Sequence, residues 1–140
     1  MNEPKRILIV EDEAPLADVL KYRLEGAGFE VSLAVDGQEG LCKAREEAPA
    51  LIILDLMLPK LDGYKVCRLL KFDEKFKGIP IIILSARKQE SDVKLATEMG
   101  ADLFISKPYK FSELLEKISL FVGAGSTAAT SAASDPARRS

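Results

Sequence analysis

The sequence predicts an α/β domain built on a doubly wound, five-stranded parallel sheet with five helices. Three short runs are continuously apolar, which is typical of strands buried on both faces: Ile7–Val10, Leu51–Leu54 and Ile81–Leu84. Stretches with helical spacing of apolar residues separate these runs. Strands that alternate with helices favour parallel pairing, in which right-handed crossovers place helices on both faces of the sheet.

The first buried strand ends on a group of acids, Glu11, Asp12 and Glu13. Pro15 suits the first turn of a helix, and Gly28 suits the left-handed position that ends one. Between them, apolar residues recur at helical spacing at Leu16, Val19, Leu20, Leu24 and Ala27.

The segment 29–33 alternates apolar and polar residues, so one face of this strand is expected in solvent, at an edge of the sheet. Asp36 and Glu39 resemble a capping box at the start of the next helix. That helix should stop at Pro49, with Leu41, Ala44 and Ala48 facing inward.

The central strand, Leu51–Leu54, stops on Asp55, and Asp62-Gly63 then forms a turn into a third helix marked by Val66, Cys67 and Leu70. A charge at the end of a buried strand is costly to desolvate unless the site is open and binds a cation. We therefore expect Asp55 to be displayed at the edge of the sheet.

The last two strand–helix pairs follow. Ile81–Leu84 ends on Ser85, and the helix expected over 89–99 has a thin apolar stripe, which predicts mobility. The final strand, 103–105, leads to Ser106-Lys107-Pro108, and Ser112 is expected to cap the final helix. Because the alternating strand must lie at an edge and the three continuous ones inside, the predicted strand order is 2-1-3-4-5.

Composition is that of an ordinary soluble protein. The 140 residues are 47% hydrophobic and 30% charged, with a net charge of −2. The interspersed charges do not indicate a surface for nucleic acid or for anionic membranes. No apolar run approaches the roughly 20 residues of a membrane helix, and no signal peptide is evident, so we expect a cytoplasmic location. The sequence has no histidine, which excludes a histidine-based triad and a histidine-ligated metal.

Two further features bound the domain. Cys42 and Cys67 form no C-x-x-C pair and are interpreted as reduced, small core residues. From residue 123 the composition changes to Ala, Ser, Thr and Gly, which cannot bury enough apolar area to order a segment. We therefore expect a folded domain over 1–122 and a flexible tail or linker over 123–140.

Polar side chains follow four of the five predicted strands. In open α/β sheets ligands bind outside the carboxyl ends of the strands, where the strand order reverses. Three carboxylates at one place repel each other and need a counter-charge, and hard oxygen ligands suit Mg²⁺. An ammonium and a hydroxyl suit phosphate oxygens, and a carboxylate beside Mg²⁺ is a credible nucleophile on phosphorus. The residues expected to converge are Glu11, Asp12, Asp55, Ser85 and Lys107.

With these motifs in place, the sequence resembles the receiver domain of two-component response regulators, of the stand-alone, chemotaxis-regulator type, whose fold is flavodoxin-like. The resemblance covers residues 5–122. Its matching pieces are I-L-I-V-E-D over 7–12, D-L-M-L-P-K-L-D-G over 55–63, Ser85-Ala86, Gly100-Ala101-Asp102 and Lys107-Pro108.

The resemblance implies a role for each residue of the site. Asp55 would accept a phosphoryl group from a sensor histidine kinase or a phosphotransfer protein. Asp12, Asp55 and the backbone carbonyl of Met57 would bind Mg²⁺, with Glu11 acting through water. Ser85 and Lys107 would hold the phosphoryl oxygens. Such a domain is a phosphoacceptor in signalling rather than an enzyme.

The resemblance also implies a switch. Phe104 would swing inward as Ser85 moves toward the phosphoryl group, and the Lys107-Pro108 bond would be cis. The face made by the fourth helix, the fifth strand and the fifth helix would bind a downstream protein, with no direct contact to nucleic acid or membrane. Receivers of transcription factors share Asp102 and dimerise through this face. The final helix lacks the arginine that they use, so we do not expect that dimer.

Two neighbouring positions bear on the lifetime of the phosphoryl group. Met57 lies two residues past Asp55, and Arg87 lies two past Ser85. In the family that the sequence resembles, these two positions flank the attacking water. Neither side chain orients that water as a carboxylate or amide would, so the resemblance implies slow hydrolysis.

Alternatives remain open at this point. A receiver-like scaffold that binds partners without phosphorylation would not need the complete set of acids with Ser85 and Lys107. A phosphatase of the haloacid-dehalogenase type also uses an aspartyl nucleophile but carries D-x-D at the first strand, where this chain has Glu11-Asp12. A carrier of flavin mononucleotide shares the fold, but no Ser/Thr-rich phosphate loop follows the first strand.

Overall fold

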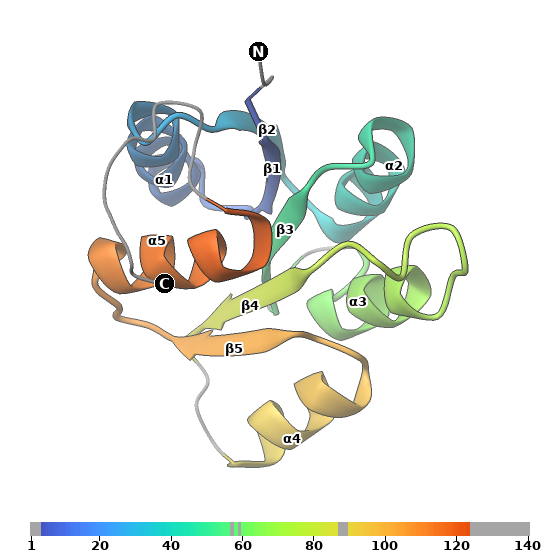
Figure 1. Cartoon of the computed structure of the whole chain (residues 1–140). Helices are drawn as coiled ribbons and strands as arrows, with labels where there is room; N and C mark the ends of the chain where they lie inside the picture. Colours follow the sequence, from blue (N-terminus) through green and yellow to red (C-terminus); the bar gives the residue numbers. More distant parts are fainter. Residues whose placement is uncertain (1–3, 57, 59, 87–89, 124–140) are drawn as a thin grey trace.

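The computed structural model describes residues 4–56, 58, 60–86 and 90–123. Strands and helices alternate along the chain without exception in this part (Figure 1). In order they are β1 (Arg6–Val10), α1 (Ala14–Gly26), β2 (Glu30–Ala34), α2 (Gly37–Glu47), β3 (Leu51–Asp55), α3 (Gly63–Lys71), β4 (Ile81–Ser85), α4 (Glu90–Glu98), β5 (Leu103–Ser106) and α5 (Phe111–Val122).

The five strands form one parallel sheet in the order β2-β1-β3-β4-β5, which confirms the predicted topology. Helices α1 and α5 cover one face, and α2, α3 and α4 cover the other (Figure 1). The residues of β1, β3 and β4 contribute to both cores, because their alternate side chains point to opposite faces. This double burial explains why their sequences are continuously apolar.

Local signals at several helix ends are confirmed. The Asp36 carboxylate accepts a hydrogen bond from the Glu39 N–H at 2.7 Å, and the Glu39 side chain accepts one from the Val35 N–H at 2.8 Å. Bonding to the Glu39 N–H lowers the pKa of Asp36. Gly28 has a φ of 98° after α1, the left-handed conformation expected there.

Other expectations about helix ends and faces were wrong. Helix α5 begins at Phe111 and not after Ser112, because packing of the Phe111 ring against the α1–α5 core fixes the start of the helix. Ala48 is an exposed, left-handed C-cap of α2 with φ 45°, a common way for a helix to end, and does not face inward. On α1, the side chains of Leu16 and Val19 are 50% and 56% exposed, and Ala17 lies inward instead.

The cysteine interpretation was half right. Cys67 is buried in α3, where desolvation raises the pKa of its thiol to about 12. Cys42 is exposed on α2 and is not a core residue.

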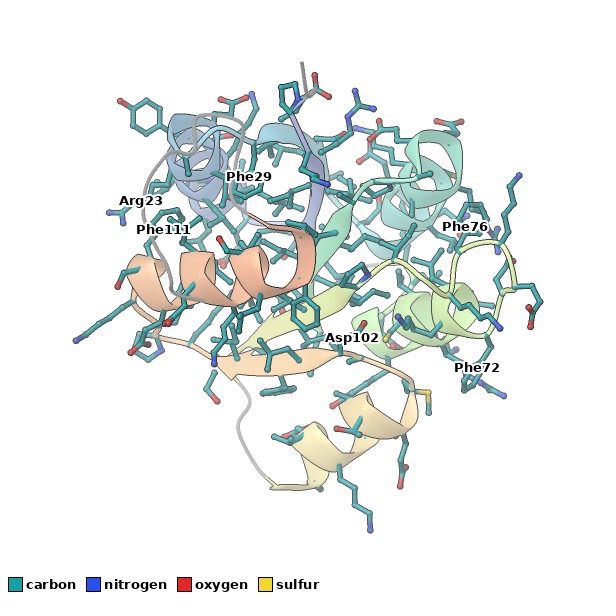
Figure 2. The ribbon with its side chains drawn as sticks, viewed as in Figure 1. Arg23, Phe29, Phe72, Phe76, Asp102 and Phe111 are labelled. Carbon is teal, nitrogen blue, oxygen red and sulfur yellow. The ribbon has the colours of Figure 1, made fainter. Side chains whose placement is uncertain are left out.

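Asp102, at the start of β5, joins three elements. Its Oδ2 atom accepts hydrogen bonds from the Lys71 ammonium of α3 at 2.9 Å and from the Ile81 N–H of β4 at 2.8 Å. Figure 2 shows Asp102 between the sheet and α3. No helix in the described part of the chain is long and apolar enough to cross a membrane.

Candidate functional site

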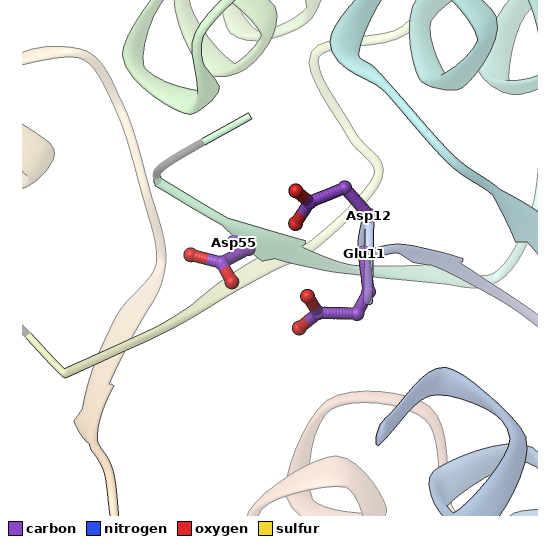
Figure 3. A group of neighbouring side chains, drawn as sticks. All are labelled: Glu11, Asp12 and Asp55. Carbon is purple, nitrogen blue, oxygen red and sulfur yellow. The ribbon is translucent and has the colours of Figure 1, made fainter. Parts of the chain in front are cut away.

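The carboxyl ends of β1 and β3 bring three acids together (Figure 3). Each of Glu11, Asp12 and Asp55 offers one oxygen, and these oxygens lie within 4.8 Å of one another. The side chains of Glu11 and Asp55 are only 10% and 12% exposed, whereas Asp12 is exposed. Parallel register produces this arrangement, because Val10 pairs with Leu54 and both strands end at the same edge.

Lys107 approaches the acids from the end of β5. Its Nζ atom lies 3.3 Å from Oδ2 of Asp55 and 3.4 Å from Oε1 of Glu11. The Lys107 N–H donates to the Ser85 carbonyl at 2.8 Å, which fixes the end of β5 beside β4. The Lys107–Pro108 peptide bond is cis, as the resemblance implied. The structure therefore brings Lys107 into contact with two of the three predicted acids.

The electrostatics of the site are those of an incompletely neutralised acid cluster. Burial raises the pKa of Glu11, and the charge of Asp55 acts in the same direction, against the Glu13 N–H and the Lys107 ammonium. Burial by itself would lower the pKa of Lys107, but the charges of Asp55 and Glu11 outweigh it and the pKa is raised. Three carboxylates facing one ammonium leave a net negative site, which favours a cation.

The backbone around Asp55 is fixed by Gly63 at the start of α3. A Cβ atom on Gly63 would overlap the carbonyl oxygen of Asp55 and lie 2.8 Å from Cα of Leu56. The Gly63 N–H donates to the Leu56 carbonyl, and Asp62 caps α3 by accepting from the Lys65 N–H at 3.0 Å. The predicted Asp62-Gly63 turn is thus confirmed, and it ties α3 directly to the central acid.

A second support joins the loop after β3 to the start of α2. The Nζ atom of Lys60 lies 3.6 Å from Oδ2 of Asp36. A Cβ atom on Gly37 would overlap the backbone of Leu61. Sequence reasoning missed this support. The only signal available was the Asp36-Gly37 pair, which reads equally well as a simple helix start.

The structure describes two of the remaining predicted residues, Ser85 and Phe104, but not Met57. Ser85 ends β4 and is 1% exposed. Phe104 of β5 is partly buried against the core under α2, α3 and α4. Met57 and Arg87 lie outside the described residues, so the carbonyl ligand and the slow hydrolysis stay predictions.

A cavity of about 440 Å³ opens beside the acids, between α1 and α5, and no pattern in the sequence indicated it. Its walls include Leu16 and Leu20 of α1, and Asp55, Lys107 and Tyr109 also line it. Burial raises the pKa of the Tyr109 phenol. Figure 2 shows Arg23 of α1 next to Phe111 of α5, and the guanidinium carbon lies 5.4 Å from the ring centre.

This is the fold of a doubly wound α/β domain with an acidic site and a lysine at the reversal of strand order. The model of the response regulator receiver domain family matches residues 7–119, and the chain belongs to that family. Receiver domains are signalling domains that are phosphorylated on an aspartate and bind Mg²⁺ at an acidic pocket, and this chain carries such a cluster.

Curated relatives are longer proteins. The chain is 44% identical over 114 residues to the DNA-binding response regulator MtrA of Mycobacterium tuberculosis, covering 81% of this chain and 49% of the relative. It is 41% identical over 127 residues to the alkaline phosphatase synthesis transcriptional regulatory protein PhoP of Bacillus subtilis, covering 91% and 52%. The chain thus spans about half the length of the curated relatives it matches.

Solved structures of similar size share the fold. A putative response regulator from Chloroflexus aurantiacus superimposes with a TM-score of 0.80 at 33% identity, covering 85% of this chain and 98% of the other. The receiver domain of a sensor histidine kinase from Pseudomonas aeruginosa superimposes with a TM-score of 0.79 at 30% identity, with the same coverage. That second structure is described as having a magnesium ion coordinated in its active-site cleft.

Proposed function

We propose that Asp55 accepts a phosphoryl group from a sensor histidine kinase or a phosphotransfer protein, and that this changes the partner-binding face of the domain. One observation carries the proposal. Glu11, Asp12 and Asp55 gather at the strand ends, while Lys107 bridges Glu11 and Asp55. An excess of carboxylates over ammonium groups at one place destabilises the fold, so it is not expected at a site with a purely structural role.

Each residue has a part in the transfer. Asp12, Asp55 and the Met57 carbonyl would hold Mg²⁺, with Glu11 acting through water. The metal supplies positive charge that offsets the charge of the transferring group.

The transfer then proceeds at Asp55. One of its oxygens attacks phosphorus while the bond from phosphorus to the donor histidine nitrogen breaks, and the released imidazole takes a proton from water. Lys107 shifts from the Asp55 carboxylate to a phosphoryl oxygen, and Ser85 donates its hydroxyl proton in a hydrogen bond to another. The residues mainly align the phosphoryl group and balance its charge.

The output is proposed at the face made by α4, β5 and α5. Phosphorylation shifts the population toward a conformation in which Ser85 and Phe104 have moved, and that conformation binds a downstream protein. DNA binding is named for the whole MtrA protein, of which the matched part is 49%. The expectation of no contact with nucleic acid therefore applies to the receiver domain by itself.

The direct test is adduct formation at Asp55. With Mg²⁺ and acetyl phosphate, intact-mass measurement should show one added phosphoryl group, which peptide mapping should place on Asp55. With Mg²⁺ and BeF₃⁻, ¹⁹F NMR should show a bound signal. Asp55→Asn should abolish both signals, and Asp18→Asn, an exposed acid on α1, should change neither.

Two results would contradict the proposal. Absence of both adducts in the wild type would favour a scaffold that works without phosphorylation. Steady turnover of small phosphate esters would instead favour a phosphatase.

A further inference from the structure

Helix α4 buries little apolar surface in the described structure. Among residues 91–98 of this helix, whose side chains the structure describes, only Ala96 is buried in the core, and Val93 and Leu95 are 38% and 37% exposed. At its C-terminal end, the carbonyl of the following residue, Met99, accepts a contact from the Cys67 sulfur of α3 at 3.5 Å. With so few apolar contacts, the position of α4 depends strongly on individual polar contacts.

The N-terminal end of α4 is in contact with α3 through Tyr64. The Tyr64 hydroxyl lies 3.2 Å from Oδ1 of Asp92 and 3.4 Å from the Asp92 backbone carbonyl. The ring of Tyr64 packs against the core on this side of the sheet, so the hydroxyl is held at the end of a fixed arm. Both distances exceed the usual O–H···O range of about 2.5–3.0 Å, so the hydroxyl contact is a weak one.

Tyr64 is also coupled to the phosphoacceptor through the backbone. It follows Gly63, which fits against the Asp55 carbonyl with no room for a Cβ atom. The Val66 N–H donates to the Asp62 carbonyl, so the first turn of α3 is regular from its cap onward. The backbone at Tyr64 is therefore tied to that of Asp55, and the ring packs against the core on the same side of the sheet.

We propose that Tyr64 is a positioning residue whose hydroxyl holds the N-terminal end of α4 in the resting state and thereby opposes activation. This inference rests on the proposed function. In this proposal, the start of α4 shifts when Ser85, at the end of β4, moves toward a phosphoryl group on Asp55. Asp92 then moves relative to Tyr64. A contact made only in the resting state stabilises that state, and its removal shifts the population toward the active one.

Tyr64→Phe tests the inference, since phenylalanine keeps the ring packing and removes only the hydroxyl. The loss of one such hydrogen bond should tighten BeF₃⁻ binding about two- to fivefold at saturating Mg²⁺, as measured by ¹⁹F NMR titration. Amides of α4 should exchange faster in the unliganded protein by a similar factor. Tyr22→Phe is the matched control, because Tyr22 is 80% exposed on α1, and it should change neither quantity.

A cycle with Asp92→Ala separates the contact from other effects of that acid on the start of α4. If the two groups act through each other, the change caused by Tyr64→Phe should be much smaller in the Asp92→Ala background. A merely structural role of the hydroxyl would lower the urea midpoint and leave BeF₃⁻ affinity unchanged or weaker.

The outcomes can be told apart. Wild-type protein that binds BeF₃⁻ and a Tyr64→Phe variant that binds it equally or more weakly would overturn the inference and leave the proposed function standing. Wild-type protein that binds no BeF₃⁻ in the presence of Mg²⁺ would overturn the proposed function, and the inference with it.

Discussion

Lys107 neutralises only part of the acid charge that the sheet collects at its edge. It contacts Asp55 and Glu11, while Asp12 has no ion pair within the described residues. Asp12 is exposed, so water screens part of its repulsion from the other two carboxylates. The remaining repulsion is present whenever no cation is bound.

Asp12→Asn should therefore stabilise the metal-free protein. The three carboxylates have oxygens within 4.8 Å of one another. Removing one of these charges should raise the free energy of unfolding by about 1 kcal/mol at a high effective dielectric constant, and the melting temperature by about 4 °C. The same change should remove most of the stabilisation by Mg²⁺. Calorimetry of the variant and the wild type, each with and without about 10 mM Mg²⁺, would measure this.

The matched control for this experiment is Asp18→Asn, an exposed acid on α1. It should leave both the melting temperature and the Mg²⁺ effect unchanged. If the melting temperature of the metal-free Asp12→Asn protein equals that of the wild type, carboxylate repulsion in the site is negligible.

At the level of single residues, the positions of polar side chains at the strand ends could be predicted from sequence, but the burial of individual small residues on helices could not. Asp55 and Lys107 were placed correctly because parallel strands end at a shared edge. Cys42 was placed wrongly because its helix, α2, buries only a narrow stripe, and the direction of one small residue beside that stripe does not follow from spacing alone.

Helix α3 provides the clearest prediction at the level of elements. Gly63→Ala should force α3 away from the Asp55 carbonyl and lower the free energy of unfolding by about 1–3 kcal/mol, the usual effect of overpacking. BeF₃⁻ affinity should fall as well, because Asp55 would be displaced. Urea unfolding and ¹⁹F NMR would measure the two effects.

Gly26→Ala is the matched control, since a Cβ atom there meets nothing within 4 Å and the residue ends α1. Alanine in that helix should raise stability by about 0.5–1 kcal/mol. Equal stability of the Gly63→Ala protein and the wild type would mean that the close approach of α3 to Asp55 is unimportant.

Elements with strong periodicity or caps could be predicted from sequence, as β1, β3, β4 and the start of α2 were. The start of α5 could not, because it depends on where the Phe111 ring packs in three dimensions. The support between Lys60 and Asp36 was missed for the same reason, since it joins a loop to a distant helix.

At the scale of the whole molecule, both hydrophobic cores close within the described residues. The last fully buried side chains belong to Leu114 and Ile118 of α5, which pack under α1 and the sheet. The division into a domain over 1–122 and a tail or linker over 123–140 stays a prediction based on composition.

Removing residues 124–140 should leave stability and ligand binding intact. Because that segment is mostly Ala, Ser, Thr and Gly, we expect the shortened chain to keep the melting temperature and BeF₃⁻ affinity of the full one. Calorimetry and ¹⁹F NMR on both chains would check this. A clear loss in either would assign the segment a place against the domain.

The strand order could be predicted from sequence because hydrophobic pattern distinguishes an edge strand from an interior one. The cavity between α1 and α5 could not, because its volume depends on how two helices far apart in the chain diverge. Whole-molecule features of this kind require coordinates.

The double engagement of Asp102 bears on how two copies of this domain could meet. One oxygen of its carboxylate is already shared between an ammonium and a main-chain N–H of the same chain. A positively charged group of a neighbouring molecule would therefore find this oxygen already bonded to two donors of its own chain. Self-association through β5 that engaged this oxygen would first have to break the contacts that join α3, β4 and β5.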